Sequence, residues 1–190
     1  DIIARMEKDF GSSVQNMAAC ESPMKPGYGV KRPTESDKKL SYVDQKKYRS
    51  GVGSLNYLVK HSRPDLCNAV RELSKVLMGA TEQHMQDMHR AIKYVIVTKL
   101  WGIPLEPSYV PDEPLLDWLI EAWSDSDWAG DKDNRRSVSG FVMFLCGVPI
   151  AWRSKQQKSV ALSSSEAEFV AASEAVKEVS RRIIPVLHSD

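Results

Sequence analysis

The sequence predicts an α/β protein, with a small helical region followed by an antiparallel sheet that one long helix covers. Between residues 44 and 99, apolar residues recur at helical spacing in three segments joined by short links. Between residues 138 and 154, apolar and polar residues alternate on both sides of a glycine. The 190 residues are 42% hydrophobic and 27% charged, which is typical of a globular chain. The length suits one full domain, or a small domain with a helical partner.

The helical region is expected to contain the end of one helix and three complete ones. Residues 1–10 predict a helix closed by Gly11, and residues 19–43 predict a connector because prolines and glycines interrupt any periodicity. Asp44 is expected to cap a helix that runs to about Lys60. Two more helices follow, at residues 64–78 and 82–99, the first with Pro64 in its first turn. Three helices joined by short links predict a compact layer.

The second half predicts strands and then a helix. Strands are expected at residues 115–124, 138–145 and 148–154, with a hairpin turn at Gly147 and a short extended return at 159–162. A long helix opens at Ser163, where Ser163-x-x-Glu166 and Ser165-x-x-Glu168 both match the capping-box pattern. Its predicted apolar face consists of Ala171, Ala172, Ala175, Val176, Val179, Ile183 and Val186.

Composition argues against several classes of protein. The apolar runs are far shorter than the ~20 residues that span a bilayer, so no membrane partner is expected. No basic and then apolar leader opens the chain, so nothing signals secretion. The three cysteines, Cys20, Cys67 and Cys146, lie far apart without a CxxC pair, which argues against a disulfide framework and against a zinc site.

The net charge of +1 conceals a separation of charge along the chain. Residues 1–100 hold 17 basic and 11 acidic residues, a balance of +6, whereas residues 101–190 hold 9 and 14, a balance of −5. Nine acidic residues lie between positions 106 and 133, and residues 134–165 contain five basic and no acidic residues. This order suits a metal-dependent enzyme that acts on a polyanion. A surface that is patchy by chance is the more common reason for charge runs.

Two groups of carboxylates are candidate metal ligands. Asp125 and Asp127 follow an apolar strand, and Glu166 and Glu168 lie in the first turn of the long helix. An aspartate at a strand end, beside a glutamate on a helix packed against that strand, is the layout of a carboxylate-held Mg²⁺ site. Taken singly, an Asp-Ser-Asp run is more often a turn, and glutamate in a first helical turn is favoured by the helix dipole alone.

A third candidate is a strip of aromatic and basic residues with the composition of a nucleic-acid contact. A solvated loop is an equally good interpretation of that composition. The expected nucleic-acid-binding residues are Arg135, Arg136, Trp152, Arg153, Lys155 and Lys158.

Several segments, in order, resemble the Pol polyproteins of copia-type retrotransposons. In the helical half, these are YRSGVGSLNYL at 48–58, Arg63-Pro64-Asp65, and IKYV at 92–95 with Thr98. In the second half, these are SDSDWAGD at 124–131, RSVSG at 136–140, IAWRSKQ at 150–156 and LSSSEAEF at 162–169. The resemblance covers roughly residues 20–185, and seven matches in order make it highly specific.

The resemblance implies a fold and an activity. Residues 1–100 are then the thumb and connection of a reverse transcriptase, without its catalytic Tyr-x-Asp-Asp, and residues 115–190 are an incomplete ribonuclease H-like domain with a mixed sheet and a covering helix. That domain cuts the RNA strand of RNA–DNA hybrids with two Mg²⁺ ions, which Mn²⁺ can replace. Carried over, Asp125 and Glu168 are the catalytic, metal-binding residues, and Asp127 and Glu166 are the alternatives if the alignment is shifted by two residues.

The resemblance also implies what is missing. The family continues to a later strand ending in Asp-Asn and to a final acidic or histidine-bearing segment, so two of its four ligands are expected beyond this chain. Hydrolysis is therefore expected of the intact Pol protein, in an intracellular setting: the cytoplasm, in a virus-like particle, and the nucleus. The alternatives are a catalytically inactive remnant that only binds nucleic acid, and a structural module of the polyprotein.

Overall fold

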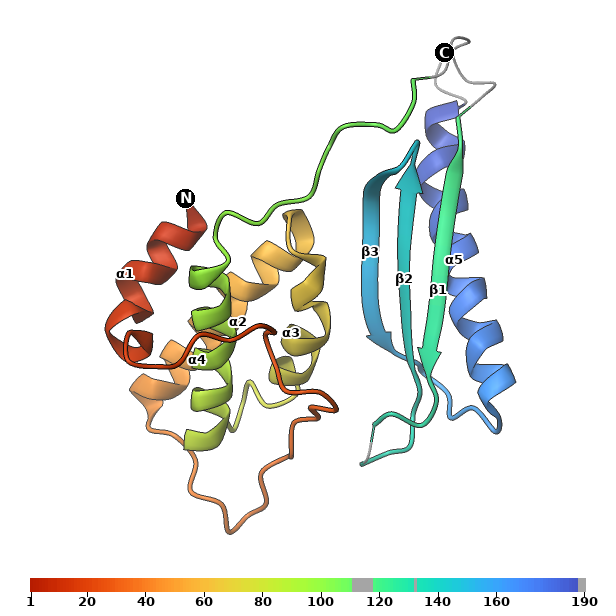
Figure 1. The fold of residues 1–190 in the computed structure, drawn as a ribbon. Helices are drawn as coiled ribbons and strands as arrows, with labels where there is room; N and C mark the ends of the chain where they lie inside the picture. The colour runs from red at the N-terminus through yellow and green to blue at the C-terminus, as the bar shows by residue number, and fades with distance from the viewer. Residues whose placement is uncertain (111–117, 132, 188–190) are drawn as a thin grey trace. The chain divides into compact units, whose positions relative to one another are not determined.

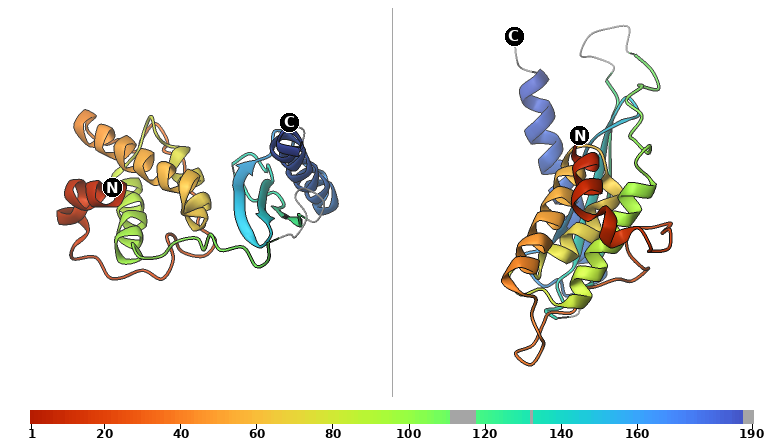
Figure 2. Two further views of the ribbon diagram at one scale, coloured as in Figure 1. Left: turned by 90° about the horizontal axis from the view of Figure 1, so that it is seen from above. Right: turned by 90° about the vertical axis from the view of Figure 1, so that its left-hand side faces the viewer.

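The computed structural model describes residues 1–110, 118–131 and 133–187, with side chains described up to residue 182. The chain is mixed α/β, and it divides into two compact units (Figures 1 and 2). We call residues 1–102 the helical unit and residues 103–190 the sheet unit, and each is described by itself. No helix among the described residues is long and apolar enough to cross a membrane.

The first two helices of the helical unit begin and end differently from the prediction. Helix α1 (Ile2–Val14) continues through Gly11, because Met6, Phe10 and Val14 are buried at four-residue spacing and their packing outweighs the cost of glycine. Helix α2 (Tyr42–His61) is capped by Ser41 and not by Asp44.

The middle of the helical unit is shorter than predicted. The expected helix at 64–78 is a 3₁₀ turn (Pro64–Leu66) followed by helix α3 (Cys67–Ser74). Helix α4 (Glu82–Val97) begins as predicted, with Thr81 and His84 forming a reciprocal cap. The predicted connector is attached to α3, because the backbone N–H of Val30 donates to the buried carboxylate of Glu72 at 3.0 Å.

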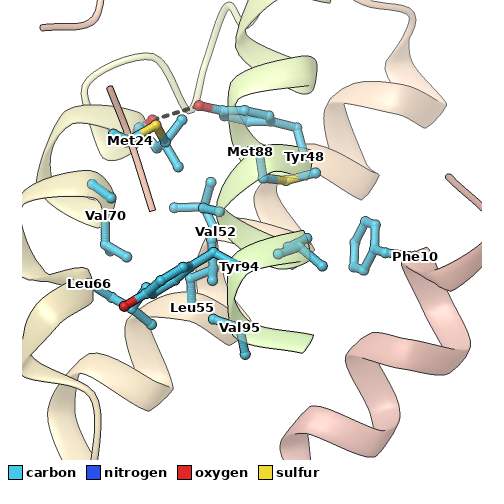
Figure 3. Packing of buried hydrophobic residues seen from close by; sticks show 14 of the residues in the cluster. Phe10, Met24, Tyr48, Val52, Leu55, Leu66, Val70, Met88, Tyr94 and Val95 are labelled. Atoms are coloured by element: carbon cyan, nitrogen blue, oxygen red, sulfur yellow. Dashed lines mark hydrogen bonds between the residues drawn. The ribbon is translucent and has the colours of Figure 1, made fainter. Parts of the chain in front are cut away.

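The helical unit packs around one core. Tyr48, Val52 and Leu55 of α2 are buried against α3 and α4, and the Tyr48 hydroxyl donates to the carbonyl of Leu73 at 2.8 Å (Figure 3). At Gly51 the helices approach so closely that an added Cβ would run into the Met88 side chain of α4. A larger residue there would force Met88 to shift, so the constraint at this position is space and not backbone conformation.

The sheet unit is a three-stranded antiparallel sheet with one helix on it. The strands β1 (Ile120–Asp127), β2 (Val138–Leu145) and β3 (Val148–Gln156) pair in the order β1-β2-β3. The hairpin turn lies at Gly147 as predicted, with a positive φ of 83°. The first strand runs three residues past its predicted end, and the predicted positions 115–117 lie outside the described residues. The extended return expected at 159–162 is not a strand.

Helix α5 (Ser164–Leu187) packs along β1 and β2 (Figure 1). Its contact face differs from the prediction, because Ala172 and Val176 are exposed and Ala167 is buried. The buried residues Ala167, Ala171 and Ala175 recur every four positions, so the contact is made by the smallest side chains. The side chains of the predicted positions 183 and 186 lie outside the described residues.

Candidate functional site

The candidate aspartates lie at the end of β1, on the face of the sheet turned away from α5. Ser124 pairs directly with Phe141, which packs against Ala175 of α5, so Ser124 faces the helix. Side chains alternate between the two faces along a strand, and Asp125 and Asp127 therefore lie on the opposite face. Both aspartates are exposed.

The candidate glutamates lie in the first turn of α5 and have different contacts. The hydroxyl of Ser163 accepts a hydrogen bond from the Glu166 backbone at 3.1 Å, and the Glu166 carboxylate accepts one from the Leu162 backbone at 2.7 Å. Glu166 is therefore engaged in capping the helix. The box predicted from Ser165 to Glu168 does not form, because Ser165 already lies within the helix. The side chain of Glu168 is exposed.

The fold brings these carboxylates to one end of the sheet unit but not to one face. The end of β1 and the start of α5 lie at the same end of the unit (Figure 1), where the Trp128 indole donates to the Ala161 carbonyl at 3.2 Å. Asp125 faces away from the helix that carries Glu168. In the part of the chain that the structure describes, no three acidic, histidine or cysteine side chains form a group that could hold a metal ion. The described residues do not by themselves fit a Mg²⁺ site.

The predicted nucleic-acid strip is divided between the two faces of the sheet. Trp152 pairs with Val142 and Arg153 with Phe141, so Arg153 faces α5 and Trp152 faces away from it. Lys155 shares the face of Arg153. The pKa of Glu178 on α5 is lowered, mainly by a hydrogen bond from Arg182, and the charge of Arg153 contributes to the shift.

The remaining three predicted basic residues lie at the end of the sheet unit that carries the carboxylates. Arg135 and Arg136 are exposed in the turn between β1 and β2, where Arg135 has a φ of 58°. Lys158 is exposed in the link between β3 and α5. These residues can reach a phosphate backbone at that end without crossing the sheet.

An aromatic row on the exposed face had not been predicted. Trp123, Val142 and Trp152 are directly paired across the three strands, and the Trp123 side chain is 65% exposed. Asp125 is two residues along from Trp123 on the same face. The residues on this face can therefore offer a carboxylate beside ring surfaces on which a base or sugar can stack. Alternation along β1 could have predicted the Trp123–Asp125 pair, but the alignment with Trp152 requires the register.

A buried polar network holds the site end together, and its members were also missed. Ser137, Ser139 and Gln157 are 0–3% exposed. The Ser137 hydroxyl accepts from the backbone of Ala129, and the Gln157 side chain donates to Ser139 and to the carbonyl of Ala167. This network joins the turn after β1, the start of β2, the end of β3 and the first turn of α5.

Asp131 organises the turn that carries the two arginines. Its carboxylate is buried, and it accepts from the backbone N–H groups of Asp133 and Asn134 at 3.0 and 3.2 Å and from the Gln156 side chain at 2.6 Å. The Asp-x-Asp-Asn sequence is typical of such a turn and could have predicted it. Nothing in the sequence indicates that this aspartate, and not Asp125, is the buried one.

Several curated proteins similar to this chain are named as transposon proteins. The chain is 41% identical over 127 residues to the retrovirus-related Pol polyprotein from transposon RE1 of Arabidopsis thaliana, covering 67% of this chain and 8% of that protein. It is 38% identical over 132 residues to the one from transposon TNT 1-94 of Nicotiana tabacum, covering 70% of this chain and 9% of that protein. A secreted RxLR effector protein 161 of Plasmopara viticola is 39% identical over 131 residues, which are 69% of this chain and 87% of the effector.

The chain belongs to the copia-type retrotransposon Pol polyproteins. It spans less than a tenth of the length of the Pol polyproteins it matches. No family model matches the chain. No solved structure matches it either.

Two of the Pol-like motifs meet inside the helical unit and have a structural role there. Arg63 is 3% exposed, and its guanidinium donates to the Asp65 carboxylate at 2.8–3.3 Å and to the hydroxyl and carbonyl of Thr98 at 2.8 and 3.2 Å. The Tyr94 hydroxyl also donates to Asp65, at 2.8 Å. In this Pol segment, the Arg-Pro-Asp motif therefore ties the turn before α3 to the end of α4.

Proposed function

We propose that the sheet unit is the first part of a ribonuclease H-like domain, which in the intact Pol protein hydrolyses the RNA strand of RNA–DNA hybrids. The helical unit would then be the thumb and connection of the reverse transcriptase. The observation that carries the proposal is that the fold brings the candidate carboxylates to one end of the sheet unit. Asp125 at the end of β1 and Glu168 in the first turn of α5 lie at the same end of a three-stranded antiparallel sheet with one covering helix.

The contacts at the helix start favour Glu168 over Glu166 as the functional glutamate. Both glutamates are exposed, but the Glu166 carboxylate is occupied by capping, whereas Glu168 directly follows the buried Ala167. Both aspartates share the face of the exposed Trp123 ring, and Asp125 is favoured because it lies next to that ring. Sequence register alone left both choices open.

Metal chemistry is proposed only for the intact protein. Ligand charge sets the affinity of an oxygen site for Mg²⁺, and the described carboxylates are divided between two faces of the sheet. The chain alone is therefore expected to bind hybrids through its basic residues and its aromatic row, without cutting them. This is the second candidate function, and the split between the faces favours it for the isolated chain.

A hybrid assay separates the candidates. The chain is mixed with a fluorescently labelled RNA–DNA hybrid, with and without Mg²⁺, and anisotropy and product formation are measured in parallel. We expect the affinity for the hybrid to fall steeply as the salt concentration rises, because about one counterion is released for each phosphate neutralised. We expect no cleavage, because the described carboxylates do not form a metal site. Absence of any salt-dependent affinity would instead favour a purely structural module.

The activity itself is tested in a longer Pol segment that contains this chain. We expect Mg²⁺-dependent cleavage of the RNA strand, lost in Asp125→Asn and in Glu168→Gln and largely kept in the matched controls Asp127→Asn and Glu166→Gln. Cleavage that survives in Asp125→Asn would refute the assignment of that residue. A segment that binds hybrids but never cuts them would refute the nuclease proposal.

A further inference from the structure

Among the described residues, the contact between α5 and the sheet is made mostly by small apolar side chains. The helix meets the sheet mainly through Ala167, Ala171 and Ala175, each at most 3% exposed, and Val179 is partly buried against the same cluster. Apolar burial depends on area and not on direction, and alanines have no side chain long enough to interlock. The alanine stripe therefore favours close approach but does not fix where along its axis the helix sits.

Gln157 supplies the direction that the alanines lack. Its backbone N–H donates to the Ser137 carbonyl at 2.8 Å, and its side-chain Nε2 donates to the Ser139 hydroxyl at 3.0 Å and to the Ala167 carbonyl at 2.9 Å. The side chain is 2% exposed. A backbone carbonyl can only accept, so Ala167 also determines which end of the amide faces the helix.

The same amide has a second buried end. Gln157 Oε1 and the hydroxyl of Ser126 are buried side-chain atoms without a hydrogen-bond partner in the described structure. Ser126 pairs directly with Ser139, the acceptor of the Gln157 amide, so both belong to the helix-facing side of the sheet. A polar amide at this position costs desolvation that an apolar residue would avoid. Filling space is therefore not a sufficient reason for a glutamine here.

We propose that Gln157 is a positioning residue, which fixes the first turn of α5 against the start of β2 and the end of β3 and thereby sets the position of Glu168. Glu168 follows the anchored Ala167 directly, so any shift of that carbonyl moves the glutamate with it. Displacing a catalytic group by about 1 Å can cost on the order of a hundredfold in rate. The structural part of this proposal stands alone, and the catalytic consequence rests on the proposed nuclease function.

The structural part is tested by hydrogen exchange on the full chain. Gln157→Met keeps the volume of the side chain and removes both hydrogen bonds from it, and Gln157→Glu keeps the shape but turns an acceptor toward the Ala167 carbonyl. Gln156→Met is the matched control, since Gln156 donates to Asp131 and Asn134 and not to the helix. We expect amides 166–171 to exchange about tenfold faster in both Gln157 variants, with amides 175–179 and the melting temperature of the helical unit unchanged.

Two results would overturn the structural part of the proposal. Unchanged exchange at amides 166–171 in both variants would show that the amide does not hold the turn. Uniformly faster exchange along all of α5, equal at 166–171 and 175–179, would show a general stabilising role and no positioning.

The catalytic part uses the longer Pol segment. Gln157→Met is expected to lower kcat for hybrid cleavage at least tenfold with KM unchanged. An unchanged kcat together with faster exchange at amides 166–171 would refute the proposed effect on Glu168 and leave the structural role of Gln157 standing. If the unmodified segment does not cut hybrids, the nuclease proposal fails and the exchange result still decides the positioning of α5.

Discussion

Replacing Asp65 by asparagine tests whether the buried arginine of the helical unit depends on its partner. Arg63 is 3% exposed, and its guanidinium makes three hydrogen bonds to the Asp65 carboxylate and two to Thr98. The Tyr94 hydroxyl donates to the same carboxylate. Asp65→Asn keeps the shape of the side chain and removes its charge, so the guanidinium stays buried with only neutral partners.

The expected cost follows from burial. Removing one partner of a fully buried ion pair costs about 3–5 kcal/mol. The Asp65 side chain is 35% exposed, so water can supply part of the lost interaction, and the expected cost is about 2–3 kcal/mol. For a unit of about 100 residues this corresponds to a fall in melting temperature on the order of 10 °C.

The cost is expected to depend on pH. Burial by itself raises the pKa of the Asp65 carboxyl, but hydrogen bonds from Arg63 and Tyr94 outweigh burial and hold that pKa below its ordinary value of 3.8. A group with a lowered folded pKa stabilises fully above its unfolded pKa and loses this effect as the pH falls through the folded value. The difference between the natural chain and Asp65→Asn should therefore be full at pH 7 and shrink below about pH 4.

Exchange of the slowest amides in α2 and α4 measures the unfolding free energy of the helical unit separately from the sheet unit. Asp9→Asn is the matched control, because Asp9 forms an exposed pair with Arg5 at 3.6 Å and its loss should cost less than about 0.5 kcal/mol. If Asp65→Asn costs no more than Asp9→Asn at pH 7, the buried pair does not stabilise the unit and the reasoning is wrong.

Three further outcomes follow from neighbouring positions with different surroundings. Gly53→Ala should stabilise α2 by up to about 1 kcal/mol, because nothing lies near the added methyl group. Gly51→Ala should destabilise α2 by about 1–2 kcal/mol, because the added methyl group overpacks the contact with Met88. In thermal melts the two variants must shift the melting temperature in opposite directions. Glu166→Ala should cost about 1 kcal/mol by removing a helix cap while Glu168→Ala leaves stability unchanged, and equal melting temperatures would contradict this division of roles. Ser126→Ala should leave stability unchanged or slightly raised, since the buried hydroxyl has no partner to lose, and a clear loss in urea denaturation would reveal one.

Local chemistry made much of the fold predictable. Residues 138–145 alternate and Gly147 follows, a local pattern that predicts a hairpin, and the start of α4 at Glu82 was likewise predictable. Gly11 was misleading because its local cost is small beside the burial of Met6 and Phe10, which the sequence does not reveal.

The sequence by itself determined the family, the order of the elements and which carboxylates are candidates, because these depend on residue identity and spacing along the chain. Only the tertiary structure decided that Glu166 caps α5 while Glu168 is exposed, that Trp152 and Arg153 serve opposite faces, and that Gln157 ties β3 to the helix. The physical reason is that strand register and the packing of distant segments set which side chains meet, and a shift of one residue would reverse every face assignment in the sheet.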